Sequence, residues 1–523
     1  MSHYDGDMAE QPAEQDQAVL FAGGERQIPS PVEEEALAGE VRVQWIDRQQ
    51  MRLAMIDVEQ LIAEDHAARA IWELTGQVDL GEFYEGVRSR QGQAGRPVID
   101  VRLLASLWIY GQSLGIHSAR ELEQLCQTDP AFQWLCGMEP VNYHTLSDFR
   151  VSHAAALEKL FVQVVGVLSH AGLVKLEQVM HDGTRIQACA SGSSLRRQAT
   201  VEQHMEAARR QLQELEAAGE AESTRRQAAA RQRAAQERVR RVEAARQELE
   251  KIQSAAKAPS QARVSLTDPE ARVMKHGGGE YAPSYNVQIS TDAAHKVIVG
   301  VEVGQNASDA VLLKPALQTL ERRLGQLPRQ LVADAGYATQ SNIADLAGRA
   351  IDFYAPIPQA DKNPDALRQR GVTPAFFPEQ FRYDAGGDQF LCPAGKVLHH
   401  STQQERGHSV LHVYRARAAD CRGCPDKARC TPRYSSRCVL RIVEQEVITV
   451  FRQKMETDHA QLIYHRRAEV AEFPNAWIKA KIKLRQFCVR GLGKVRQQAL
   501  WAALTYNIQQ YIRLVWRPRF AAA

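Results

Sequence analysis

The sequence has 523 residues, of which 44% are hydrophobic and 24% are charged, an ordinary composition for a globular protein of two or three domains. It contains no run of about 18 apolar residues, which excludes a membrane-spanning helix. The N-terminus lacks the apolar stretch of a secretion signal, so we expect a cytoplasmic protein, associated with the nucleoid if it binds DNA.

The net charge of +3 conceals a strong segregation of acids and bases. Residues 1–40 carry ten acids and one Arg, whereas residues 464–519 carry twelve Lys or Arg and two Glu. The acidic segment has no apolar periodicity and is predicted to be disordered. The basic segment predicts a polyanionic partner, and the alternative is a solvated helix face.

Residues 41–175 have apolar residues at helical spacing and are predicted to form an all-helical N-terminal domain. Ser118 with Glu121, and Thr145 with Asp148, have the spacing of capping boxes. Short helices with tight turns suit a helix-turn-helix-like domain. Two interpretations stay open for it, DNA binding and packing or dimerisation.

A tract rich in Ala, Arg, Gln and Glu follows at residues 195–258. Its apolar residues recur every three or four positions on both sides of Gly219, which predicts two antiparallel helices with a narrow seam. The predicted seam residues are Val201, Met205, Ala208, Leu212, Leu215, Val239, Val242, Leu249 and Ile252. Fourteen basic and ten acidic residues favour a solvated arm over a DNA clamp.

This arm interrupts a domain at residues 176–360 in which strands and helices alternate. A strand that gives way to a turn at Asp182-Gly183 precedes the arm, and a two-strand hairpin, a helix, a strand ending at Asp334, a helix and a strand follow it. The order predicts an α/β fold with a mixed sheet. Two carboxylates that meet at strand ends would repel each other unless a cation lay between them, and Mg²⁺ prefers such oxygen ligands.

The sequence resembles the DDE transposases of bacterial insertion sequences, which have an RNase-H-like catalytic domain. Three blocks carry the acids of that family, MHDGTRIQACAS around Asp182, LVADAGYATQSNIADL around Asp334 and YHRRAEVAEFPNAWIK around Glu472. The hairpin APSYNVQISTDAAHKVIVGVEV, the closing segment RQFCVRGLGKVRQQALWAALTYNIQQY and the N-terminal segment from GRPVIDVRLL to HTLSDFR are also similar. The resemblance covers about residues 45–515 in collinear order.

The resemblance implies that Asp182, Asp334 and Glu472 are catalytic and bind Mg²⁺ or Mn²⁺. The expected reaction is two-metal cleavage of phosphodiesters at the ends of the element, followed by strand transfer into target DNA. The implied partners are double-stranded DNA and a second copy of the chain, as a homodimer on DNA. The alternatives are an RNase-H-like nuclease without strand transfer and a catalytically silent DNA-binding protein.

Residues 456–523 are predicted to supply the C-terminal catalytic helices. The Tyr–Arg–Glu–Lys signature of the family matches Tyr464, Arg467, Glu472 and Lys479, and the two cations and the tyrosine are expected to contact DNA. At about 100° per residue, all four lie on one helix face about 140° wide.

Three details of this region carry further expectations. Pro474 is expected to kink the helix or restart it. Glu469, one turn before Glu472, is a rival for the third ligand. His181 adjoins Asp182, but neighbours along a strand point to opposite faces, so it is expected to face away from the metals.

Five of the nine cysteines fall within a 47-residue window of a Cys-rich insertion, residues 361–455. In a cytosolic chain such clustering indicates metal binding rather than disulfides. Cys392, Cys421, Cys424 and Cys430 are predicted to hold a structural Zn²⁺ that staples an insertion too small for a core of its own. Alternative ligands are Cys438, His399 and His400, and the other interpretation is a set of reduced thiols without metal.

Overall fold

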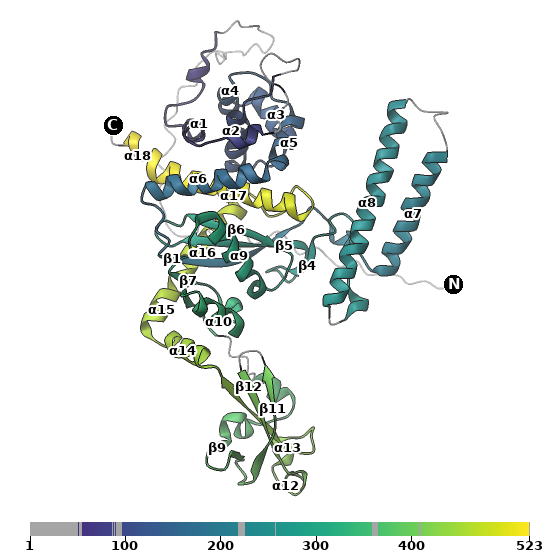
Figure 1. The fold of residues 1–523 in the computed structure, drawn as a ribbon, viewed down its shortest axis with the longest axis vertical. Coiled ribbons are helices and arrows are strands. Elements are labelled where there is room, and N and C mark those ends of the chain that lie inside the picture. Colours follow the sequence, from purple (N-terminus) through teal and green to yellow (C-terminus); the bar gives the residue numbers. More distant parts are fainter. Residues whose placement is uncertain are drawn as a thin grey trace, which may run out of the picture. The chain divides into compact units, whose positions relative to one another are not determined.

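The computed structural model describes residues 51, 55–85, 87, 89, 97–217, 225–256, 258–357, 364–406 and 409–521. It combines helices with three separate sheets (Figure 1), as expected of an α/β protein. The segment 1–40, predicted to be disordered, lies outside the described residues.

The largest sheet has six strands, which come from both sides of the arm. They are β1 (Gln178–Gln187), β4 (Arg272–Lys275), β5 (Tyr281–Asp292), β6 (Ile298–Gly304), β7 (Gln330–Val332) and β8 (Asp352–Tyr354). The order is β5-β1-β7-β8, and β4 and β6 both pair with the other edge of β5. β1, β7 and β8 are parallel, whereas every pairing of β5 is antiparallel. The predicted mixed sheet is therefore present, with β4 as an addition.

The N-terminal part contains helices and 3₁₀ turns but no strand among its described residues before 178. Its helices are α1 (Ala67–Gln77), α2 (Val101–Ser113), α3 (Ala119–Thr128), α4 (Pro130–Cys136), α5 (Tyr143–Ser152) and α6 (Ala154–His170). Ser118 caps α3 and accepts a hydrogen bond from the Glu121 N–H, as predicted. The second predicted cap is wrong, because Asn142 caps α5 and Thr145 lies inside the helix.

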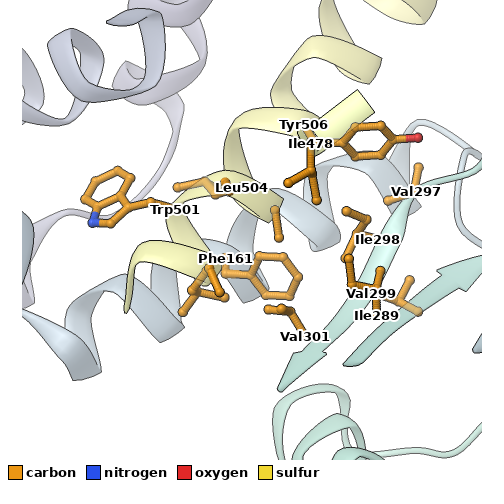
Figure 2. Packing of buried hydrophobic residues seen from close by; sticks show 14 of the residues in the cluster. Phe161, Ile289, Val297, Ile298, Val299, Val301, Ile478, Trp501, Leu504 and Tyr506 are labelled. Carbon is orange, nitrogen blue, oxygen red and sulfur yellow. The ribbon is translucent and has the colours of Figure 1, made fainter. Parts of the chain in front are cut away.

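These helices share one hydrophobic core with the sheet. The long helix α17 (Leu492–Tyr511) lies between the two, with α6 and α2 beside it and β6 on its other side (Figure 1). Figure 2 shows Phe161 of α6, Leu504 of α17 and Val301 of β6 packed in this cluster. The N-terminal helices and the sheet are thus joined by buried apolar surface, which resists their separation.

The arm is a helical hairpin of α7 (Gln198–Ala217) and α8 (Arg225–Ala255), which run side by side (Figure 1). Its seam holds a small core that includes Val201, Met205 and Leu249, as the spacing of apolar residues predicts. Two short strands, β2 (Leu195–Arg196) and β3 (Val264–Ser265), pair where the arm leaves and rejoins the rest of the chain.

The Cys-rich insertion has a fold of its own, contrary to the prediction. Five antiparallel strands run in the order β13-β12-β11-β10-β9. They are β9 (Arg382–Asp384), β10 (Gln389–Leu391), β11 (Val397–Arg406), β12 (Ser409–Ala416) and β13 (Cys438–Glu444), with the short helices α11 (Pro364–Gln369), α12 (Ala418–Arg422) and α13 (Lys427–Cys430). Phe381, Leu398 and Tyr414 belong to a core separate from the main one. Aromatic residues from three strands and from the segment before β9 contribute most of its apolar surface.

Two sets of helices complete the chain. α9 (Asp309–Leu324) and α10 (Gln340–Gly348) connect the later strands of the large sheet, and α14 (Glu446–Met455), α15 (Asp458–His465), α16 (Arg467–Ala480), a π-helical turn (Ile512–Trp516) and α18 (Pro518–Ala521) follow the insertion. Among the described residues no single helix is long and apolar enough to cross a membrane. The pair α5 and α6, bent by 77°, is jointly apolar enough, but its apolar residues lie in the main core.

Candidate active site

The sheet register brings Asp182 and Asp334 to the same level. The last parallel pair of β1 and β7 is Met180 with Val332, and each carboxylate comes two residues later. Because side chains alternate between faces, both are expected on the same side of the sheet. Asp334 follows its strand as predicted and accepts a hydrogen bond from the Gly336 N–H at 2.8 Å. Asp182 does not end its strand, because β1 continues to Gln187 and stays paired with β5.

The guanidinium group of Arg467, at the start of α16, joins three carboxylates. Its Nη2 lies 3.1 Å from Asp182 Oδ1 and 3.9 Å from Asp334 Oδ2, and its Nη1 lies 4.0 Å from Glu472 Oε1. Three acids that are far apart in the sequence therefore gather around a single cation.

Glu469, the rival of Glu472, lies elsewhere. Its carboxylate pairs with Lys296 Nζ at 2.7 Å, whereas Glu472 contacts the guanidinium that also binds Asp182. The geometry therefore favours Glu472 as the third acid of the cluster.

Asn475 also belongs to this cluster, although the sequence did not point to it. Its Nδ2 donates a hydrogen bond to Asp182 Oδ2 at 3.0 Å, and the residue is 8% exposed. Its Oδ1 is buried without a hydrogen-bond partner among the described residues. Asn475 lies four residues before Lys479, so the same helical periodicity that links the signature residues could have identified it.

The predicted single helix face is wrong for Tyr464. α15 ends at His465 and α16 begins at Arg467, so Tyr464 lies on the preceding helix and is partly buried against the main core. Pro474 does not restart the helix, since one helix runs from Arg467 to Ala480 with the proline inside it. A proline in that position removes one backbone hydrogen bond, and its buried side chain packs in compensation.

Burial and charge together set the electrostatics of the site. Burial raises the pKa of Asp182, and the neighbouring Asp334 raises it further, while Arg467 opposes both. Burial also lowers the pKa of Lys479, against the attraction of Asp182. Asp182 is thus a buried carboxylate beside a second one, Asp334, and the cations nearby belong to α16. Such an arrangement is typical of functional sites.

His181 points to the opposite face of the sheet from Asp182, as predicted. It hydrogen-bonds Ser290 Oγ at 2.9 Å and Gln288 Oε1 at 3.0 Å, and it is fully buried. Burial lowers the pKa of His181 to about 4, so its imidazole is neutral at physiological pH. Its two hydrogen bonds hold His181 within the sheet, against side chains of β5.

The three acids fit a divalent cation by their chemistry, because carboxylate oxygens are the ligands that Mg²⁺ prefers and these already surround a cation. In this structure that cation is the guanidinium of Arg467. Across the described residues, no three His, Cys, Asp or Glu side chains are arranged to hold a metal ion. Metal binding would therefore require the carboxylates to move closer to one another and the side chain of Arg467 to leave its place between them.

Four cysteines of the insertion, Cys392, Cys421, Cys424 and Cys430, line one small cavity, and all are free thiols. Two of their sulfurs accept backbone hydrogen bonds, Cys392 from Lys396 at 3.2 Å and Cys421 from Arg437 at 3.4 Å. Burial raises the pKa of Cys430 to about 11.

The alternative ligands Cys438, His399 and His400 are not among the residues that line this cavity. His400 instead faces His412, with 3.2 Å between their ring nitrogens. The cavity therefore gathers the four cysteines that the sequence singled out and none of the alternatives.

Two models of protein families match the chain. A model described as a transposase DDE domain matches residues 391–512, and one described as a transposase domain (DUF772) matches residues 56–152. The first match contains Glu472 and Arg467 but not Asp182 or Asp334. No curated protein matches the chain. The two matches support a DDE transposase, a class of enzyme that acts on DNA and normally uses divalent metals.

Proposed function

We propose that the protein is the DDE transposase of a bacterial insertion sequence, which binds the terminal inverted repeats of its element, cleaves phosphodiesters there and transfers the ends to target DNA. The observation that supports this most is the meeting of Asp182, Asp334 and Glu472 around Arg467. The strand order β6-β5-β1-β7-β8, with its first three strands antiparallel and its last three parallel, supports an RNase-H-like core. We also propose a homodimer on DNA, since the element has two ends.

The three carboxylates would hold Mg²⁺ or Mn²⁺, which supplies Lewis-acid activation and charge neutralisation at the scissile phosphate. The other residues act around them. Asn475 fixes the orientation of Asp182 by its hydrogen bond at 3.0 Å, and Arg467 and Lys479 neutralise phosphate oxygens when DNA is bound. Tyr464 would contact DNA from α15.

The direct test is incubation of the protein with DNA that carries the flanking ends of its element, with Mg²⁺ or with a chelator, followed by separation of the fragments by size. We expect cleavage at the ends and joined products with Mg²⁺ only. Cleavage without joined products would favour a nuclease, and DNA binding without cleavage would favour a silent DNA-binding protein.

Replacement of Arg467 should strengthen metal binding in the absence of DNA. A charge-assisted hydrogen bond contributes about 1.5–3 kcal/mol, so removal of this competing cation in Arg467→Ala should raise the affinity for Mn²⁺ by roughly 10- to 100-fold. Calorimetric titration of Mn²⁺ measures this. The matched control is Lys296→Ala, which removes the cation paired with Glu469 and should change nothing. An unchanged or weaker affinity in Arg467→Ala would contradict the role of its guanidinium as a stand-in for metal.

We propose that the four cysteines of the insertion bind a structural Zn²⁺, because they line one cavity and two of their sulfurs already accept N–H hydrogen bonds. Their side chains would have to turn toward one another to reach the ion, since they are not arranged as a metal site in this structure. The double variant Cys421→Ser/Cys424→Ser should lose the zinc that the purified wild-type protein contains. The control is Cys488→Ser, an exposed cysteine outside the insertion. Elemental analysis measures the zinc content of the wild type, the double variant and the control. An equal zinc content in all three would refute the site.

A further inference from the structure

The five residues after the catalytic helix α16 alternate between buried and exposed. Ile482 and Leu484 are 0% and 1% exposed, while Lys481, Lys483 and Arg485 face the solvent. We call these three cations the basic strip. It begins two residues after Lys479 of the candidate active site, and the positive charge of Arg485 contributes to lowering the pKa of Lys479.

The backbone of the basic strip is held in place by hydrogen bonds to three other segments. The Ile482 carbonyl accepts from His117 Nε2 at 2.6 Å, Leu484 N–H donates to the Ile478 carbonyl at 3.0 Å, and the Arg485 carbonyl accepts from Gln187 N–H at 3.2 Å. The strip is therefore fixed between the N-terminal helices and the end of β1.

Lys483 has a strained backbone, with φ of 59° in the left-handed region that favours glycine. Its stem lies against the backbone of Gly115, where an added Cβ would come within 2.6 Å of Lys483 Cδ. Strain of this kind persists only where the surrounding structure enforces it, and it tends to occur at functional sites.

The three cations of the basic strip form no ion pair with a carboxylate among the residues that the structure describes. Arg485 donates instead to the Lys479 carbonyl at 3.2 Å. Arg496, eleven residues later, shows the contrast, since it pairs with Glu302 at 3.0 Å. Three unpaired cations on a backbone held in place repel one another, and a polyanion would offset that repulsion.

We propose that the basic strip binds the phosphates of the DNA strand that leads away from Asp182, Asp334 and Glu472. This inference rests on the proposed function, and it adds the path of the substrate from the site. The strip touches backbone phosphates and not base edges, so it positions any sequence equally well.

The test measures how the affinity for a fluorescein-labelled DNA duplex of mixed sequence depends on salt, with full-length protein. The logarithmic slope falls by about 0.9 for each phosphate that the protein no longer neutralises. The triple variant Lys481→Gln/Lys483→Gln/Arg485→Gln should therefore lower the slope by roughly 2.7. The matched control, Arg210→Gln/Arg231→Gln/Arg233→Gln, removes three exposed cations of the arm and should leave the slope unchanged.

A second variant, Lys481→Gln/Arg485→Gln, spares the strained position and should lower the slope by about two thirds as much. A wild-type slope in this variant, or an equal decrease in the arm control, would overturn the inference and leave the proposed function standing. If the wild-type protein itself bound no DNA, the proposed function would fail instead.

Discussion

The variant Asp182→Asn should retain DNA binding and lose strand cleavage by at least about 10³-fold, because a metal ligand contributes several kcal/mol to the transition state and each 1.4 kcal/mol is a factor of ten. Asp182 is the most enclosed of the three acids, with its side chain 16% exposed against 40% for Asp334 and 65% for Glu472. Cleavage of end-bearing DNA and electrophoretic mobility of the complex, measured side by side, separate the two effects.

Stability provides the control for this variant. Burial raises the pKa of Asp182, so the folded protein binds that proton more tightly than the unfolded chain does. The protonated carboxyl of Asp182 therefore favours folding at low pH. Its contribution to the stability of the fold is lost as the pH rises through the pKa of Asp182 in the folded protein. The side-chain amide introduced by Asp182→Asn is neutral at every pH and avoids that loss of stability. The melting temperature of this variant at neutral pH should therefore not fall. A lower melting temperature together with weaker DNA binding would assign the lost cleavage to misfolding.

The second large effect on cleavage distinguishes Glu472 from Glu469, the two glutamates of α16. Glu472→Gln should reduce cleavage by roughly 10²- to 10³-fold, because it removes the third carboxylate from the cluster. Glu469→Gln, three residues away, removes only an exposed ion pair with Lys296, and such pairs contribute little. Its cleavage rate should remain that of the wild type.

Single-turnover cleavage of one labelled DNA end is the appropriate measurement, since it is independent of product release. Both variants keep the length and shape of the side chain, so they differ only in which carboxylate is removed. Loss of cleavage in Glu469→Gln with activity retained in Glu472→Gln would reverse the assignment.

Much of the fold could be predicted because its signals are local. Alternating β-branched residues indicated β5 and β6, and the spacing of apolar residues indicated the arm helices α7 and α8. The five-stranded sheet of the insertion was missed because β11 reads VLHHSTQQER, in which few apolar residues alternate. Its core depends on Phe381, Leu398 and Tyr414, which come from separate segments and carry no common period.

Gly183 shows why the strand around Asp182 was misread. A glycine after aspartate usually indicates a turn, but here the strand continues, and a Cβ on Gly183 would lie within 2.9 Å of side-chain atoms of Asp309, Gln288 and Tyr337. This glycine permits close approach of other side chains to the strand. Sequence spacing cannot distinguish that use from a turn, because the neighbours come from other elements.

For the site, the three acids could be proposed from the sequence, but their common contact could not. Arg467 was expected to neutralise phosphates, and its place between the carboxylates depends on the packing of α16 against β1. The spacing of four residues between Asn475 and Lys479 places both on one helix face, but the role of Asn475 appears only with Asp182 beside it.

The position of α17 near the end of the chain determines when the layers of the fold can pack together during translation. Trp501, Leu504 and Tyr506 of this helix are almost fully buried, and the helix fills the space between the N-terminal helices and a sheet that is translated long before it. Until the ribosome has delivered α17, the two layers lack the large apolar surface that this helix contributes between them. A nascent chain that still lacks this helix therefore has the apolar side of β6 without the helix that covers it in the complete fold.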